Sequence, residues 1–334
     1  MQVTKRAAQG VTKRALLTTA CAVLAAALPG AGAFAQAPAW PTKPLRILVG
    51  FPPGSTPDMA ARAIADPLAK VLGQAVIVEN KPGASGNIAT GQVAKATDDH
   101  TLGVVINGNL TSAKMLYPDL PYDPAKDFSY ISLLATAPLV LVAPANSPTG
   151  AAFFTAAKQG GKQWNYGSVG VGSVGHLGVE LLKTKMPGVQ AEHIPYQGNP
   201  AVVTALLSNQ INMALVPPGL AVAQVNAGKL KAIGLTSGRS ALAPNIPPLS
   251  DAGLKDFNLE VWTALVGPAS LSRGAQARLA TAMGEVMKNA DVRRQMFNQG
   301  WQAVGTSSEG LKTRVADESA IMKSIITRNG IKLQ

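Results

Sequence analysis

Apolar segments of strand length alternate with segments of helical periodicity along the first third of the chain. The apolar runs lack the strict alternation of a strand with one solvated face, which is typical of strands buried on both sides. Strands that alternate with helices predict parallel βαβ units with helices on both faces of a sheet. The predicted elements are, in order, a strand over 45–51 (LRILVGF), a helix over 58–73 that ends at Gly73, a strand over 74–80, a helix over 86–96 and a strand over 101–108.

The same alternation restarts in the middle of the chain. N-cap residues for the last three helices are predicted at Ser272, at Asp291 and at Ser307 or Ser308, because short polar side chains can accept a hydrogen bond from the first helical turn. The predicted elements are strands over 138–146, 191–196, 230–237 and 259–269, and helices over 176–186, 199–210, about 272–289, 291–299 and 307–329.

The strand at 138–146 leads out of the first group of elements, and the strand at 259–269 leads back. We therefore expect an α/β fold of two doubly wound lobes with a ligand cleft between them. One lobe comprises residues 40–142 and 263–334, and the other comprises residues 143–262. Ligands of open α/β sheets bind outside the carboxyl ends of the strands, so two such lobes that face each other form a cleft.

Residues 1–35 have the pattern of a cleaved secretion signal. A basic segment without acidic residues precedes an apolar run, and small residues occupy positions −3 and −1 of the sequence AFA before Gln36. The apolar run is too short for a membrane anchor. We therefore expect the mature protein to begin near residue 36 and to reside outside the cytoplasm.

Composition narrows the chemistry of the mature chain. The single cysteine of the sequence, Cys21, lies in the predicted signal, so the mature chain has none and we expect neither disulfides nor thiolate catalysis. Without the four basic residues of the signal, 26 Lys and Arg face 18 Asp and Glu, a net charge of +8. The basic residues are scattered and aromatic residues are few, which argues against nucleic acid and favours small anions.

A loop rich in Pro, Gly, Ser and Thr connects the first strand to the first helix. Its glycine allows close approach to a ligand, and its hydroxyl groups lie at a helix N-terminus that attracts anions. A nucleotide P-loop would require a lysine and a second glycine, so a small carboxylate is the preferred ligand. Ordinary helix capping is the alternative for the polar residues. The candidate ligand-binding residues of this loop are Pro53, Gly54, Ser55, Thr56 and Asp58.

A second loop of this kind, 166–178, precedes the helix at 176–186. Its glycines match the dinucleotide pattern G-x-G-x-x-G from Gly170 to Gly175, which leaves an NAD-type oxidoreductase as the alternative function. Its serines and backbone N–H groups again suit an anion. His176 could contact a ligand or merely belong to the capping region. The candidate residues are Ser168, Val171, Gly172, Ser173 and His176.

The sequence contains none of the common motifs of an enzyme active site. Neither a G-x-S-x-G motif nor a zinc-binding histidine pair occurs, and only three histidines are present. We therefore expect no catalytic residues, no metal and no cofactor. Further candidates for the cleft, or for ordinary turns, are Asn107, Asn109, Tyr196, Gly198 and Pro217.

These loops, in this order, resemble the solute-binding proteins of tripartite tricarboxylate transporters, the Bug-type periplasmic receptors. The similarity extends over nearly all of the predicted mature chain. It is carried by WPTKPLRILVGFPPGSTPDMAARAIA, VIVENKPGASGNIATGQVAKA, LPYDPAKDFSYIS, NYGSVGVGSVGHLGVELL, HIPYQGNPAVVTALLSNQINMAL, KLKAIGLTS and VWTALVGPASLSRGAQARLATAM.

The resemblance implies a type II periplasmic-binding-protein fold that closes on a small carboxylate. It implies that residues 53–58 and 168–176 hold one carboxylate through backbone amides and hydroxyls. It also implies a periplasmic location and delivery to the membrane subunits of a permease, with a sensor kinase as another recipient; we expect a monomer. The sequence departs from the family pattern at Ser55, at Pro57, at NGNL (107–110) and at VPP (216–218). Aliphatic dicarboxylates, aromatic carboxylates and amino acids therefore all stay open.

Overall fold

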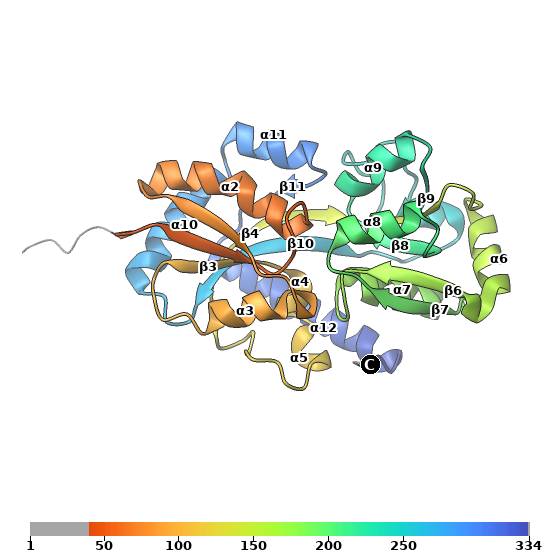
Figure 1. Cartoon of the computed structure of the whole chain (residues 1–334), viewed down its shortest axis with the longest axis horizontal. Coiled ribbons are helices and arrows are strands. Elements are labelled where there is room, and N and C mark those ends of the chain that lie inside the picture. The colour runs from red at the N-terminus through yellow and green to blue at the C-terminus, as the bar shows by residue number, and fades with distance from the viewer. Residues whose placement is uncertain (1–39, 333–334) are drawn as a thin grey trace, which may run out of the picture. The chain divides into compact units, whose positions relative to one another are not determined.

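A computed structural model describes residues 40–332, which contain two β-sheets (Figure 1). The predicted secretion signal at residues 1–35 lies outside these described residues. Within 40–332, none of the helices has the length and apolar character needed to cross a membrane.

The first sheet has six strands in the order β11-β4-β10-β3-β1-β2. It combines strands from the two ends of the chain, since the whole second sheet follows β4 in sequence before β10 joins the first sheet. Its strands are β1 (Leu45–Val49), β2 (Val76–Asn80), β3 (Thr101–Ile106), β4 (Phe128–Pro138), β10 (Glu260–Pro268) and β11 (Gln302–Ala303).

The second sheet has five strands in the order β7-β6-β8-β5-β9. All of them come from one continuous part of the chain, so this sheet lies between β4 and β10 in sequence. Its strands are β5 (Val140–Pro144), β6 (Trp164–Ser168), β7 (Ala191–Pro195), β8 (Met213–Val216) and β9 (Leu230–Leu235). The fold of two facing α/β sheets agrees with the predicted fold class. The exact lobe boundaries stay a prediction, although β5 already belongs to the second sheet from Val140 onward.

Both sheets are mixed, whereas the sequence pattern predicted parallel units. β10 pairs antiparallel with β3 and β4, and β5 pairs antiparallel with β8 and β9. The reason is geometric. β5 continues from β4 into the second sheet, and β10 brings the chain back into the first sheet. Each of these two strands therefore runs in the direction opposite to its neighbours in the sheet that it enters. The parallel strands of both sheets consequently direct their carboxyl ends toward the same region, which brings the loops that follow them together.

The helices agree with most of the predicted segments. In the first long helix, α2, the N–H of Gly73 bonds to Ala69 O at 2.9 Å with Gly73 in the left-handed region, as the predicted end requires. The long strand β4 and the helix α9 were not predicted. The helices are α2 (Thr56–Leu72), α3 (Asn87–Ala94), α4 (Asn107–Leu110), α5 (Ala113–Leu116), α6 (Ala151–Gly160), α7 (Val174–Lys185), α8 (Asn199–Leu207), α9 (Pro218–Asn226), α10 (Arg273–Val286), α11 (Ala290–Asn298) and α12 (Ser308–Arg328), with short 3-10 turns at Ala84–Gly86, Gly161–Gln163 and Leu249–Ala252.

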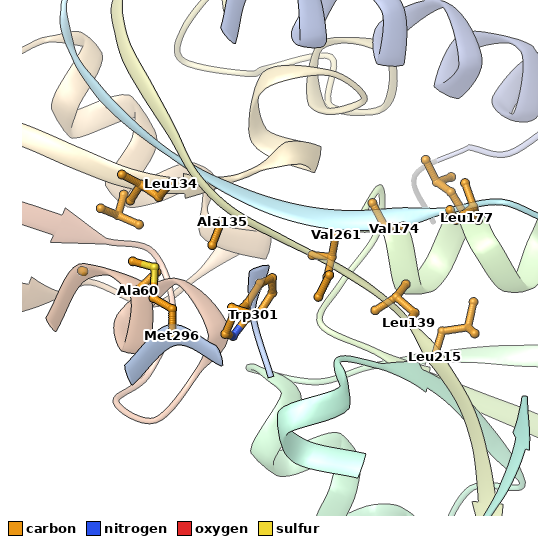
Figure 2. Packing of buried hydrophobic residues seen from close by; sticks show 14 of the residues in the cluster. Ala60, Leu134, Ala135, Leu139, Val174, Leu177, Leu215, Val261, Met296 and Trp301 are labelled. Atoms are coloured by element: carbon orange, nitrogen blue, oxygen red, sulfur yellow. The ribbon is translucent and has the colours of Figure 1, made fainter. Parts of the chain in front are cut away.

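The largest group of buried apolar residues is continuous from one sheet to the other. Figure 2 shows Ala60, Met296 and Trp301 together near one end of this core. Leu139 and Val261 lie where the chain crosses between the sheets, beside Leu215 of the second sheet (Figure 2). Burial of such side chains stabilises the folded state by about 25 cal/mol per Å² of apolar surface removed from water. The residues of the crossing region therefore contribute to the stability of the core.

The N-caps of α10 and α12 are confirmed, and that of α11 differs from the prediction. Ser272 and Ser307 accept hydrogen bonds from Ala275 N and Gly310 N at 3.3 and 3.1 Å. In α11, Asn289 Oδ1 accepts from Asp291 N at 2.8 Å, so Asn289 is the cap and Asp291 already belongs to the first turn. Either residue type can cap a helix, and only the chain's entry geometry selects between them.

We therefore predict that Asn289→Ala lowers the free energy of unfolding by about 1 kcal/mol, because the N–H groups of the first turn of α11 lose their acceptor. The exposed Asp291→Asn serves as the matched control and should change the free energy of unfolding by a few tenths of a kcal/mol, because it loses only a favourable charge at the helix N-terminus and an exposed ion pair with Arg294. Urea denaturation measures both. A larger loss in the Asp291 variant would contradict the assignment of Asn289 as the cap.

Candidate functional site

The loop between β1 and α2 is held in place by the carboxylate of Asp58. This carboxylate accepts hydrogen bonds from Gly54 N at 2.9 Å, from Asn80 Nδ2 at 2.9 Å and from Arg62 Nε at 3.0 Å. Burial acts to raise the pKa of Asp58, but the hydrogen bonds from Arg62, Asn80 and Gly54 hold this pKa below its ordinary value. A charged Asp58 therefore fixes the loop, including Gly54 with its left-handed φ of 77°.

The loop between β6 and α7 is held by internal hydrogen bonds in a similar way. Ser173 caps α7 by accepting from His176 N at 3.3 Å, and its hydroxyl donates to Gly170 O at 2.8 Å. The backbone N–H of Gly172 donates to His176 Nδ1 at 3.1 Å. Ser168 Oγ lies 2.6 Å from His193 Nε2. The side chains of Ser168 and His176 are thus engaged within the second sheet's own elements.

A small cavity of about 30 Å³ lies where these two loops meet. The N-termini of four helices border it, namely those of α2, α7, α8 and α9. None of the described residues that line it carries a charged side chain. Its lining residues are Phe51, Ser55, Thr56, Pro57, Ile106, Asn107, Leu139, Val169, Ser173, Val174, Gly175, Gly198, Asn199, Leu215, Pro217 and Val261.

Two buried polar atoms in the lining residues of this cavity are unpaired. Ser55 Oγ and Asn107 Oδ1 have no hydrogen-bond partner among residues 40–332. Ser55 is the N-cap residue of α2, yet its side chain makes no capping bond. A buried polar atom without a partner costs about 1–3 kcal/mol, so each such atom calls for a physical explanation.

A larger cavity of about 290 Å³ adjoins the small one, and Phe51 and Val169 line both. Its described lining also contains no charged side chain, but it has the hydroxyl groups of Ser85, Tyr117 and Tyr196 and the amide of Gln197. The two cavities together offer a narrow end bordered by helix N-termini and a wider end with several hydroxyl groups, and neither end has a charged side chain among its described lining.

Three hydrogen bonds connect the elements of the two sheets around these cavities. Asn199 Nδ2 donates to Thr56 Oγ1 at 3.2 Å, directly beside the small cavity. Ser112 Oγ donates to Gly172 O at 2.6 Å, and Tyr117 OH donates to Val171 O at 3.1 Å. The site is therefore composed of residues from both sheets.

The structure brings six of the predicted site residues to the small cavity: Ser55, Thr56, Asn107, Ser173, Gly198 and Pro217. Val171 and Tyr196 line the larger cavity. The other predicted residues line neither cavity: Pro53, Gly54, Asp58, Asn109, Ser168, Gly172 and His176. Asn109, for example, accepts from Ile106 N at 3.3 Å and donates to Asn87 Oδ1 at 2.8 Å.

Sequence reasoning missed Asn199 and the apolar wall of the small cavity. Asn199 follows Gly198 directly, so its place at a predicted helix start was the available signal. The apolar residues Leu139, Leu215 and Val261 lie on strands or crossing segments and have the pattern of ordinary core residues. Nothing in that pattern distinguishes a cavity wall from a filled core.

The Gly170–Gly175 stretch serves a contact between the loops of the two sheets. A dinucleotide pyrophosphate needs the glycine backbone to be open at the helix N-terminus. A Cβ atom placed on Gly170 would lie 2.0 Å from Ser85 Oγ, and Gly172 O already accepts from Ser112. This space is therefore occupied by protein. Within residues 40–332, no three His, Cys, Asp or Glu side chains gather in a group that could hold a metal ion.

His176 and His193 stack beneath the second loop with their ring centroids 4.2 Å apart. Burial, with a smaller contribution from the positive charge of Lys183, lowers the pKa of His176 to about 4. Burial and the neighbouring His176 lower the pKa of His193 to about 3, and the nearby Glu180 opposes this shift. Both rings are therefore neutral in the folded protein at neutral pH.

Acid should destabilise the protein through this pair. An unfolded histidine has a pKa near 6.5, so between about pH 6.5 and pH 4 the unfolded chain binds protons that the folded one does not. The free energy of unfolding should therefore fall over this range, and it should fall less in His193→Gln, whose side chain can still bond to Ser168. Urea denaturation as a function of pH measures both slopes. Above pH 7 the two slopes should coincide, and equal slopes below pH 6.5 would contradict the prediction.

Solved structures of known proteins share the fold of two sheets described above. A solved structure of MatC from Rhodopseudomonas palustris with bound malate is 28% identical, with a TM-score of 0.81 over 86% of this chain and 100% of that one. The periplasmic binding protein BugD is 25% identical, with a TM-score of 0.82 over 88% of this chain and 100% of that one. Rpa4515 from R. palustris with adipate is 26% identical, with a TM-score of 0.83 over 88% and 99% of the two chains.

A sequence model of a transporter receptor family covers most of the chain. It matches residues 60–331, which include the helices α7, α8 and α9 that border the small cavity, and α2 from its fifth residue onward. The two facing sheets, the cavity between their loops and this match together show that the chain belongs to the tripartite tricarboxylate transporter family receptors.

Proposed function

We propose that this protein is a periplasmic receptor that binds a small carboxylate between its two sheets and delivers it to the membrane subunits of a tripartite tricarboxylate-type permease. The family and the periplasmic binding protein BugD among its structural neighbours support the receptor role. The neighbours with malate and adipate support a carboxylate ligand. The basic N-terminal segment followed by an apolar run supports export from the cytoplasm.

The observation that carries the proposal is the convergence of four helix N-termini on an uncharged cavity. Each N-terminus has the equivalent of about half a positive charge and backbone N–H groups without helical partners. A carboxylate fits this environment because it accepts hydrogen bonds and is attracted by the dipoles. The hydroxyl group of Ser55, which has no hydrogen-bond partner among the described residues, offers one further donor.

In the proposed receptor, the lobe of residues 40–142 with 263–334 and the lobe of residues 143–262 move apart to admit the ligand. The hydrogen bonds Asn199–Thr56, Ser112–Gly172 and Tyr117–Val171 then form on closure. A ligand that binds between the lobes favours the closed form only to the extent that it contacts both, and the lining of the small cavity by both sheets provides such contacts.

A carboxylate that binds this site should raise the melting temperature of the mature protein by about 5–10 °C at a concentration of 100 times its Kd. Its amide analogue should lose most of this shift, since it has no negative charge for the helix N-termini to attract. A thermal-shift screen of aliphatic and aromatic carboxylates, each with its amide, provides the measurement. Shifts from uncharged sugars or nucleotides together with none from carboxylates would overturn the proposal.

Ser55→Ala and Thr56→Ala should each weaken carboxylate binding about tenfold or more, because each removes one hydrogen bond to a charged group. Isothermal titration calorimetry with the carboxylate found in the screen tests this. Ser132→Ala is the matched control: Ser132 is also a buried serine of the first sheet, but its hydroxyl donates to Thr306 O, away from the cavity. Unchanged affinity in both cavity variants would remove the carboxylate from this site.

A further inference from the structure

A buried carboxylate behind the small cavity fixes the orientation of Asn107. Glu318 of α12 is 6% exposed, and its Oε1 accepts from Asn107 Nδ2 at 2.6 Å. Its other oxygen accepts from Trp262 Nε1 at 2.5 Å, and Arg314 Nε lies 3.5 Å from that oxygen. All three elements, α4, β10 and α12, belong to the same side of the molecule as the first sheet. The network leaves Glu318 well satisfied.

The amide of Asn107 cannot be reversed in this environment. Its Nδ2 also donates to the backbone oxygen of Glu260 at 3.2 Å. In the reversed orientation, Oδ1 would face that carbonyl oxygen, which has no proton to share, whatever the protonation state of Glu318. Oδ1 is therefore the amide atom left unpaired, on a residue that lines the small cavity. Asn107 is 0% exposed, and its Oδ1 has no partner among the described residues.

A hydrogen-bond donor on the ligand would satisfy an unpaired acceptor in a ligand cavity and remove the cost of leaving it unpaired. A carboxylate in its charged form has no proton to donate, so it cannot satisfy Asn107 Oδ1 by itself. Ser55 Oγ, the other orphaned atom, borders the same cavity of about 30 Å³, so the donor must lie close to the carboxylate that Ser55 contacts.

The donor should be uncharged. An ammonium group on the same carbon would also offer protons, but burial of a cation without a charged partner is costly. No charged side chain lines either cavity within the described residues, and the carboxylate of Glu318 is already engaged by Asn107 and Trp262. A hydroxyl on the carbon next to the carboxylate fits without that cost.

We propose that this receptor selects 2-hydroxycarboxylates, with the carboxylate at Ser55 and Thr56 and the 2-hydroxyl donating to Asn107 Oδ1. This inference rests on the proposed carboxylate-binding function and names its ligand class. Asn107 is the specificity-determining residue, and Glu318 is a positioning residue that keeps the Asn107 acceptor directed at the ligand. The rest of the ligand extends into the larger neutral cavity, where a second carboxylate finds no counter-charge.

The first test is a calorimetric series on the full mature protein with ligands that differ only in the donor. The sets are lactate, propionate and alanine; 2-hydroxybutyrate, 3-hydroxybutyrate and butyrate; and malate and succinate. Each 2-hydroxy acid should bind about tenfold or more tightly than its deoxy partner, because the deoxy acid leaves Asn107 Oδ1 unpaired. Equal affinities, or tighter binding of alanine or 3-hydroxybutyrate, would overturn the inference. Absence of binding by every carboxylate would instead contradict the proposed function.

The second test combines the ligand change with a change of the protein. In Asn107→Ala and Asn107→Leu, the ratio of affinities between 2-hydroxybutyrate and butyrate should fall to about one. In the matched variant Thr56→Ala, both affinities should fall together and the ratio should persist, since Thr56 faces the carboxylate. A ratio that survives in both Asn107 variants would overturn the role of Asn107. Circular dichroism verifies folding, and the wild-type series stays decisive if the Asn107 variants fail to fold.

Discussion

Four helices begin at one small cavity, and the positive ends of their dipoles face a space without any charged side chain among the described residues. Of these helices, only α2 has an acidic residue in its first turn, Asp58. That carboxylate is turned away to Gly54, Asn80 and Arg62. The attraction for an anion is therefore left uncompensated by the protein, which supports the proposed carboxylate ligand even though no lysine or arginine lines the described cavity.

The reversed strands are the reason that the four helices can meet. Because β5 and β10 enter their sheets against the main strands, the carboxyl ends of the parallel strands in both sheets face one region. The helices that follow those strands start there. Asp58 fixes the first loop and His176 with Ser173 fixes the second, so backbone N–H groups are oriented before a ligand arrives. Preorganised dipoles need little rearrangement on binding, which preserves affinity.

The sequence permitted a good prediction of the elements and of the loops, but not of the roles within the loops. Hydrophobic periodicity and Gly73 predicted α2 closely, since these signals are local. Ser55 and Ser168 look alike in sequence, yet Ser55 Oγ is free at the cavity whereas Ser168 Oγ lies against His193, 25 residues along the chain. Asn107 and Asn109 differ in the same way, because Glu318 in a distant helix accepts from Asn107 Nδ2 and leaves its Oδ1 unpaired, whereas Asn109 bonds to Ile106 and Asn87. Such pairings depend on tertiary contacts that no local pattern encodes.

The position of β10 has a consequence for the order in which the chain folds. β10 is an inner strand of the first sheet, between β4 and β3, but it is made only after the whole second sheet. As the chain emerges, the second sheet can complete its pairing from one continuous segment, whereas β3 and β4 must wait for the strand that joins them. Long-range pairing of this kind is slow, and it leaves apolar strand edges exposed in the meantime. The first sheet therefore cannot be completed before β10 has been made, and a chain interrupted before Glu260 leaves β3 and β4 without the strand that joins them.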